Sequence, residues 1–158
     1  MIRGIHHVAL NTGNFDKMLA FYRDSLGFSV VFEADWENDE LSDAVVGLEG
    51  SAAKVAWLKA GNAYLELFEY RAPEARDVPP LRPSDRGYTH FCLEVKDIED
   101  EWERLSNCGM TFSRRPVDFG QFKAIYGKDP DGNIIELQEV ADAAHPIAFD
   151  ALFAQRAI

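Results

Sequence analysis

The sequence predicts an α+β fold made of two similar modules, each with the element order β-α-β-β-β. Residues 4–28 (GIHHVALNTGNFDKMLAFYRDSLGF) and 87–110 (GYTHFCLEVKDIEDEWERLSNCGM) share one pattern, in which a His-containing strand leads through a turn into an amphipathic helix. His7 and His90 lie 83 residues apart, and Gly27 and Gly109 lie 82 apart. Strand-like sequence follows each helix. Such internal similarity indicates duplicated structural units.

The helix of each half is predicted from its apolar spacing and its end signals. The first is expected to begin after the N-cap Asn14 and to end at a left-handed Gly27. The second begins at Asp97, with Asp100 three residues on, and ends at Gly109. In both, the apolar residues form one stripe that should pack on a sheet: Phe15, Met18, Leu19, Tyr22 and Leu26 in the first, and Ile98, Trp102 and Leu105 in the second.

Three strands are expected after each helix, and two of the three form a hairpin. In the first half these are SVVFEA, AKVAWLKA and AYLELFEY, with a turn at Gly61-Asn62; in the second half they are MTFSRR, FKAIYGK and NIIELQEV, with a turn at residues 129–132. Such short polar or Gly-containing joints are hairpin signals. Neither half alone offers enough sheet to cover its apolar face, so we expect the halves to pair into one domain.

The domain is expected to span residues 1–142, with module 1 at about 4–70, a connector at 71–87 and module 2 at about 88–140. Residues 35–51 (DWENDELSDAVVGLEGS) lengthen the first module with an acidic loop and one helical turn or short strand. The connector is too rich in Pro and Arg for a core element. Residues 143–158 are expected to form a helical tail that buries Ile147, Phe149, Leu152 and Phe153 on this chain or on a partner subunit.

Composition excludes several classes of function. Sixteen Lys and Arg against 27 Asp and Glu give a formal net charge of −11, which repels nucleic acid and anionic lipid. No apolar run approaches the roughly 20 residues of a membrane span, and no secretion signal is evident. We expect a cytoplasmic protein without nucleic-acid or membrane partners. Cys92 and Cys108 have no metal-knuckle spacing and are expected to be reduced, buried thiols.

Four ionisable residues each stand near the middle of an apolar strand. Alternate side chains of a strand share a face, so a polar residue between apolar neighbours points away from the core. Taken singly, each is most simply a solvent-facing side chain. Their recurrence at equivalent places favours another interpretation, because pseudo-twofold pairing of the halves brings two imidazoles and two carboxylates around one axis. The four residues are His7, Glu66, His90 and Glu136.

These four side chains suit one divalent metal ion, since such an ion satisfies four polar groups that are costly to desolvate separately. Two imidazoles and two carboxylates accept Fe, Mn, Co, Ni or Zn and leave room for water or substrate. An open position permits Lewis-acid catalysis, in which a carbonyl is polarised and a carboxylate moves a proton to and from a metal-stabilised enolate. Glu66 and Glu136 are the candidate catalytic bases.

The repeated module, together with the segments GIHHVAL, AYLELFEY, GYTHFCLEV and DPDGNIIELQE, resembles the vicinal oxygen chelate superfamily of glyoxalases, bleomycin-resistance proteins and ring-cleaving dioxygenases. The resemblance covers residues 4 to 140. It implies paired modules that form a cupped, partly open β-barrel around a central cleft, with metal ligands in the first and last strand of each module. The implied ligands are His7, which we prefer to His6 because it directly precedes the Val-x-Leu strand, and Glu66, His90 and Glu136.

The ligand pattern His-Glu-His-Glu is similar to that of bacterial lactoylglutathione lyases. The leading hypothesis is therefore a glyoxalase-like, metal-dependent lyase, isomerase or epimerase that acts on a small carbonyl, keto acid or thioester. One alternative is an Fe(II) ring-cleaving dioxygenase, in which His7, His90 and Glu136 are the ligands. Another is a bleomycin-resistance-type protein that binds a small molecule without turnover. The long acidic insertion and the Arg-rich connector depart from a minimal lactoylglutathione lyase.

Several further residues are candidates for contact with the substrate. Aromatic side chains in the strands and loops can line an apolar pocket beside the metal, although aromatic strand residues are more often plain core. Arginine of the connector can bind a carboxylate or phosphate, but a solvated surface charge is the simpler interpretation. Exposed module edges predict a homodimer. The candidate substrate-binding residues are Trp57, Phe68, Phe119, Phe122, Tyr126 and Arg86.

Overall fold

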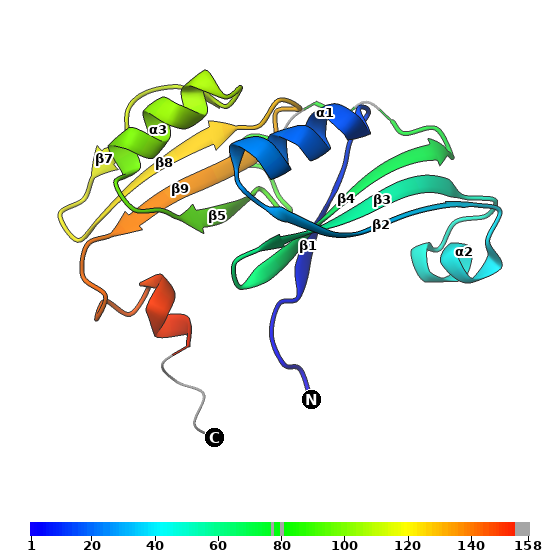
Figure 1. Cartoon of the computed structure of the whole chain (residues 1–158), viewed down its shortest axis with the longest axis horizontal. Coiled ribbons are helices and arrows are strands. Elements are labelled where there is room, and N and C mark those ends of the chain that lie inside the picture. Colours follow the sequence, from blue (N-terminus) through cyan, green and yellow to red (C-terminus); the bar gives the residue numbers. More distant parts are fainter. Residues whose placement is uncertain (77, 80, 154–158) are drawn as a thin grey trace. The chain divides into compact units, whose positions relative to one another are not determined.

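The computed structural model describes residues 1–76, 78, 79 and 81–153. The chain divides into two compact units, Met1–Pro79 and Pro80–Ile158. Each unit contains the predicted β-α-β-β-β order, so the duplicated architecture is confirmed at the level of secondary structure (Figure 1). The pairing of the modules into one domain and a partly open barrel stays a prediction.

Unit 1 is a four-stranded sheet with the strand order β1-β4-β3-β2. Its strands are β1 (His7–Asn11), β2 (Ser29–Glu37), β3 (Ala52–Ala60) and β4 (Ala63–Ala72). β1 runs parallel to β4, whereas the other neighbours are antiparallel. Gly61, with a φ of 58°, forms the turn between β3 and β4, as the Gly-Asn signal predicted.

Unit 2 repeats this topology with shorter outer strands. Its sheet has the order β5-β9-β8-β6, with β7 also paired to β8. The strands are β5 (His90–Glu94), β6 (Thr111–Phe112), β7 (Val117–Asp118), β8 (Phe122–Lys128) and β9 (Ile134–Val140). The predicted strand at residues 110–115 is therefore too long, because pairing with β8 breaks off after Phe112 and resumes at Val117.

One face of each sheet is covered by the predicted helix. In unit 1, α1 (Phe15–Ala20) continues into the wider turns of η1 (Phe21–Ser25), and Gly27 follows with a φ of 73°. The Asn14 side chain accepts the Lys17 N–H, which confirms the predicted N-cap. The core beneath combines helix and strand residues: Phe15, Met18, Leu19, Tyr22, Ala56, Leu58, Leu65 and Leu67.

In unit 2, α3 (Ile98–Asn107) buries Ile98 and Leu105 completely. The start of this helix differs from the expectation. Asp97 makes no capping bond with its side chain and adopts a left-handed φ of 55°. Instead, its backbone N–H donates to the Glu139 carboxylate on β9, so a strand residue fixes the helix start.

The insertion at 35–51 contains more regular structure than one turn. β2 continues to Glu37, and α2 (Glu40–Val46) follows, with Asp39 as its N-cap and Gly47 as its left-handed C-cap. Asp43 accepts the N–H groups of Gly50 and Ser51, which ties the return of the chain to this helix. The described part of the connector after Ala72 contains no strand or helix, in agreement with its Pro-rich sequence.

The described part of the C-terminal tail contains one short helical segment. Residues 149–152 form a short 3-10 helix, η2 (Phe149–Leu152), and residues 154–158 lie outside the described part of the chain. The Phe149 N–H donates to the Glu94 carboxylate on β5, and η2 lies on the side of its sheet opposite α3 (Figure 1). Ala148 is buried, whereas Ile147, Leu152 and Phe153 remain at least half exposed. This chain therefore does not bury these three side chains, and their burial on a partner subunit stays a prediction.

Both cysteines are free thiols, as expected, but the expectation that they are buried is wrong, because both residues are exposed. Across the described residues, no helix has the length and apolarity needed to cross a membrane.

Candidate metal-binding pairs

His7 and Glu66 form a pair on the open face of the unit 1 sheet. In the parallel pairing of β1 with β4, His7 lies opposite Tyr64 and Ala9 lies opposite Glu66. The His7 Nε2 atom is 3.3 Å from the Glu66 Oε2 atom. Leu65 and Leu67 point to the opposite, buried face, so the strand alternation predicted from sequence is confirmed here.

His90 and Glu136 form the equivalent pair in unit 2. β5 runs parallel to β9, with His90 opposite Ile134 and Cys92 opposite Glu136. The His90 Nε2 atom is 3.2 Å from the Glu136 Oε2 atom. In both units, the residue opposite the His therefore lies two positions before the Glu. The His and Glu side chains of each pair approach through the same atoms, Nε2 and Oε2. The duplication seen in the sequence extends to the local geometry of each pair.

The second ring nitrogen of each His also has an equivalent neighbour. His6 Nδ1 lies 3.0 Å from His7 Nδ1, and Thr89 Oγ1 lies 3.0 Å from His90 Nδ1. In each unit, the residue just before the His thus engages Nδ1 and leaves Nε2 toward the carboxylate. A partner on the remote ring nitrogen is what orients a metal-ligating His.

An aromatic residue flanks each pair from the neighbouring antiparallel strand. Trp57 lies opposite Glu66, and its ring centroid is 4.8 Å from that of His7. Tyr126 lies opposite Glu136, and its ring centroid is 4.7 Å from that of His90. The Trp57 indole N–H donates to Glu66, and the Tyr126 hydroxyl is 3.4 Å from His90 Nε2. Two of the predicted substrate-binding residues therefore contact the pairs.

Desolvation is the main cause of the pKa shifts of Glu66 and of Cys92 and Tyr126, the two neighbours of Glu136. Burial raises the pKa of the Glu66 carboxyl, although His7 and the Trp57 hydrogen bond oppose the shift. Desolvation, with the charge and hydrogen bond of Glu136, raises the pKa of the Cys92 thiol to about 12. Desolvation, then Glu136 and Cys92, also raises the pKa of the Tyr126 phenol. Cys92 and Tyr126 are therefore neutral donors at physiological pH.

The donor atoms of each pair fit two neighbouring ligands of one ion. Ligands bound at about 2.1 Å are separated by about 3.0 Å at a right angle and about 3.4 Å at a tetrahedral angle; the two measured separations lie between these values. Over the described residues, no three His, Cys, Asp or Glu side chains gather into a metal-binding group. Each unit thus supplies two donors, and the convergence of all four on one ion stays a prediction.

The other predicted substrate-binding residues occupy varied positions. Phe68 lies on the same face as Glu66, two residues further along β4. Phe122 lies on the same face as Tyr126 and stacks on Phe119, whose ring is largely exposed. Arg86 is exposed in the connector. Their roles stay predictions.

Sequence reasoning missed Trp36, Tyr70 and Thr89 as parts of these surroundings. Trp36 and Tyr70 lie opposite the small buried residue Ala53 on the same sheet face as Glu66. The period-two pattern of AYLELFEY includes Tyr70, but Trp36 lies in residues 35–51, whose acidic sequence predicts a loop. Thr89 could be predicted as a neighbour of the site only after His90 had been identified as a candidate metal ligand.

Comparison with known proteins assigns the family. The family model for the Glyoxalase/Bleomycin resistance protein/Dioxygenase superfamily matches residues 4–137. The chain belongs to this superfamily, and the resemblance inferred from its motifs is confirmed.

Individual relatives cover most of the chain. A lactoylglutathione lyase of Pseudomonas putida is 28% identical over 143 residues, which are 84% of this chain and 82% of the relative. A glyoxalase family protein of Bacillus cereus superposes with a TM-score of 0.81 at 20% identity, covering 90% of this chain and 97% of that chain. The fosfomycin resistance protein FosX of Listeria monocytogenes, complexed with Mn(II) and sulfate, superposes with a TM-score of 0.59 at 17% identity and covers 88% and 93% of the two chains. The two structures establish the fold.

Proposed function

From this family membership and the two equivalent His–Glu pairs, we propose that the chain is a metal-dependent lyase or isomerase of the glyoxalase type. The proposed substrate is a small carbonyl compound, keto acid or thioester. The proposed ligands of one divalent ion are His7, Glu66, His90 and Glu136. The observation that carries the proposal is the repeated contact of Nε2 with Oε2 at 3.2–3.3 Å in both units.

The ion, when bound, supplies a Lewis acid that polarises a substrate carbonyl and acidifies the neighbouring C–H bond. Side chains of the protein carry out the proton transfer and the positioning. Glu66 is our first candidate for the base, because desolvation raises its pKa and strengthens its carboxylate as a proton acceptor. It accepts a proton from the carbon next to the carbonyl and returns it to the product. The Trp57 N–H holds the carboxylate in place.

Tyr126 and Cys92 supply neutral donors beside Glu136. The thiol donates to the Glu136 carboxylate, and the phenol lies within reach of His90 Nε2. Both groups stay protonated at physiological pH, so they orient the pair without adding negative charge. We propose that Tyr126 also contacts the substrate.

The four ligands require the two units to pair, within one chain or between two chains. β1 and β5, which carry the His residues, are the edge strands of their sheets, and edge strands favour pairing with further strands. We propose a homodimer that acts in the cytoplasm. A small-molecule substrate agrees with the name of the relative from Pseudomonas putida, which is a lactoylglutathione lyase.

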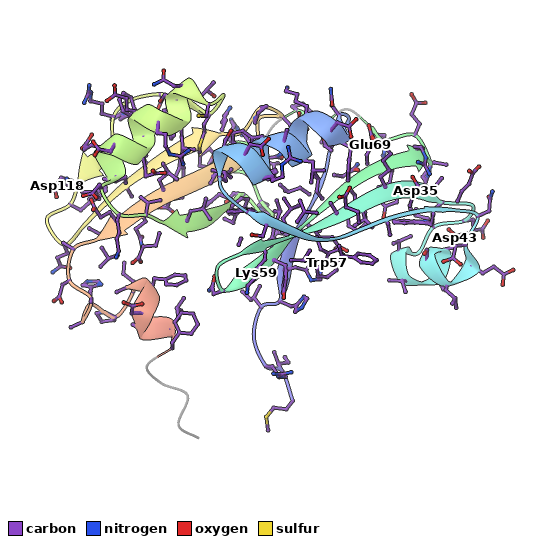
Figure 2. The ribbon with its side chains drawn as sticks, in the orientation of Figure 1. Asp35, Asp43, Trp57, Lys59, Glu69 and Asp118 are labelled. Atoms are coloured by element: carbon purple, nitrogen blue, oxygen red, sulfur yellow. The ribbon has the colours of Figure 1, made fainter. Side chains whose placement is uncertain are left out.

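Metal content measured on purified protein tests the ligand set. We expect about one divalent ion per chain, with strong loss of affinity in His7→Ala, Glu66→Gln, His90→Ala and Glu136→Gln alike. Glu69→Gln is the matched control, because Glu69 lies on β4 but faces α1, on the other side of the sheet from Trp57 (Figure 2). Unchanged metal content in Glu66→Gln alone would replace the proposal with the three-ligand dioxygenase site.

Proton exchange tests the reaction. A substrate of the proposed class should exchange its α-proton in deuterated water, and both a chelator and Glu66→Gln should abolish the exchange. Oxygen uptake with catechols would instead identify a dioxygenase. Ligand binding that persists unchanged without metal and in His90→Ala would leave a binding protein as the only interpretation.

A further inference from the structure

We propose that an aromatic cluster of unit 1, formed by Trp36, Phe68 and Tyr70, is a subsite for an aromatic group of the substrate. The inference rests on the proposed function, because it names the substrate class of the same site. It adds a preference for aryl-substituted keto acids or carbonyl compounds over small aliphatic ones.

The three rings form a continuous contact on the open sheet face. The Trp36 centroid lies 6.0 Å from both the Phe68 and the Tyr70 centroids, and its ring is nearly perpendicular to each. Phe68 and Tyr70 are 5.6 Å apart. Edge-to-face arrangements at such distances are favourable for aromatic rings. All three side chains are only half buried, so the cluster offers aromatic surface that a further ring can join.

Small residues and fixed hydrogen bonds hold the cluster in shape. Trp36 and Tyr70 face each other across Ala53, which is fully buried between their strands. The Trp36 indole N–H donates to the Ser51 hydroxyl at 2.9 Å, and Ser51 is fully buried. The Asn11 side chain accepts the Tyr70 backbone N–H. The rings are therefore positioned before any ligand arrives, which lowers the entropic cost of binding.

The register places this cluster directly beside the His7–Glu66 pair. Phe68 follows Glu66 by two residues on the same face, a step of about 6.8 Å along the strand. A phenyl group attached directly to a carbonyl has the length to span that step. The carbonyl then lies by Glu66 while the ring lies by Phe68 and Trp36.

A positively charged side chain at one end of the sheet face that carries Glu66 would orient a ligand with a carboxylate. Lys59 lies on the same sheet face as Trp57 (Figure 2) and opposite Tyr64, and it is therefore on the side of Glu66 away from Phe68. Arg71, next to Tyr70 in the sequence, donates to both carboxylate oxygens of Asp35 at 2.6 Å, and Asp35 lies on the other face of the sheet, opposite Lys54. A ligand with a carboxylate at one end and an aryl ring at the other matches this order, with the carboxylate toward Lys59 and the ring toward Trp36.

Two α-keto acids test the subsite, because benzoylformate and pyruvate share their carboxylate and carbonyl and differ only in phenyl against methyl. Calorimetric titration of the full-length protein, with and without Mn²⁺, gives the ratio of the two Kd values. We expect benzoylformate to bind at least about tenfold more tightly than pyruvate. Phe68→Leu and Trp36→Ala should each reduce this ratio to about threefold or less, with pyruvate affinity unchanged. Phe32→Ala, which removes an exposed ring of β2 outside the cluster, should preserve the ratio.

The outcomes separate the two proposals. Equal affinities for the two acids, or no binding of benzoylformate, would overturn the subsite. A ratio that survives Phe68→Leu, the variant that keeps apolar volume while removing the ring, would overturn it as well. The aryl preference can depend on the cluster while the Kd of neither acid changes with Mn²⁺ or in His7→Ala. In that case the subsite proposal stands and the proposal of a metal-dependent function fails.

Discussion

Asp129 should be the residue on which the β8–β9 hairpin most depends. The residue is 3% exposed. Oδ1 accepts the N–H groups of Asp131 and Asn133 at 3.0 and 2.8 Å, and Oδ2 accepts the Asn133 Nδ2 group at 2.9 Å. Each bond to a charged acceptor contributes about 1.5–3 kcal/mol, but the three share one side chain and are not additive. We expect Asp129→Ala to lower the free energy of unfolding by about 2–4 kcal/mol.

Urea and thermal unfolding measure this loss. For a chain of this length the expected decrease in Tm is about 4–16 °C. Asp129→Asn should be intermediate, because it keeps the Oδ1 acceptor but places an amide donor against the Asn133 donor. Adding Asn133→Asp to that variant reverses the polarity of the side-chain bond and should recover more than half of the loss. A loss below about 0.5 kcal/mol in Asp129→Ala, or a double variant no more stable than Asp129→Asn, would refute the reasoning.

Three other changes probe the packing, the His orientation and the Glu66 carboxyl. Gly127→Ala should cost about 1–3 kcal/mol in urea unfolding, because a Cβ there meets Met110 Cε and Phe112 Cε1 at 2.5 Å; full stability would show that these side chains move aside freely. Thr89→Val should weaken metal affinity about 10- to 100-fold in a competition titration with a chelator, whereas Thr111→Val, on an outer strand, should leave it unchanged. Glu66→Gln should stabilise the metal-free protein at neutral pH, because the raised pKa of Glu66 means that the wild type loses stability as pH rises from the ordinary carboxyl range through that pKa. Urea unfolding at pH 4 and pH 7 should show this gain growing with pH, and a gain that is independent of pH would contradict it.

Local patterns allowed most of the fold to be predicted. The Asn14 cap, the Gly27 end and the turns at Gly61 and Asp129 depend on neighbouring residues, and the structure confirms them. The prediction that Asp97 caps its helix is wrong because the group that fixes the helix start is Glu139, 42 residues away. The length of β6 was misjudged for the same reason, since it depends on where pairing with β8 breaks off. Tertiary partners decide such points, and one sequence does not reveal them.

The pairs could be predicted because strand alternation and duplication both pointed to the same side chains. Their immediate surroundings could not, because they depend on register between strands. Trp57 meets Glu66 and Tyr126 meets Glu136 only through the antiparallel pairing of neighbouring strands. The proposed metal ligands can therefore be predicted from the sequence, whereas the groups that orient them are identified only by the structure.

The two units have similar His–Glu pairs but differ in their second strand, which in unit 1 carries Trp36 of the aromatic cluster. Their His–Glu pairs have the same register and nearly the same distance, so the duplication preserves what an ion requires. The second strand of the module does not follow this symmetry: β2 has nine residues and reaches Glu37, whereas β6 has two. Trp36 lies on the extension of β2 that the insertion provides, and the insertion also supplies Ser51, which holds its indole. The insertion at 35–51 thus supplies Trp36 to the aromatic cluster and holds its indole, and for this reason we expect substitutions in unit 1 to change substrate preference more than equivalent substitutions in unit 2.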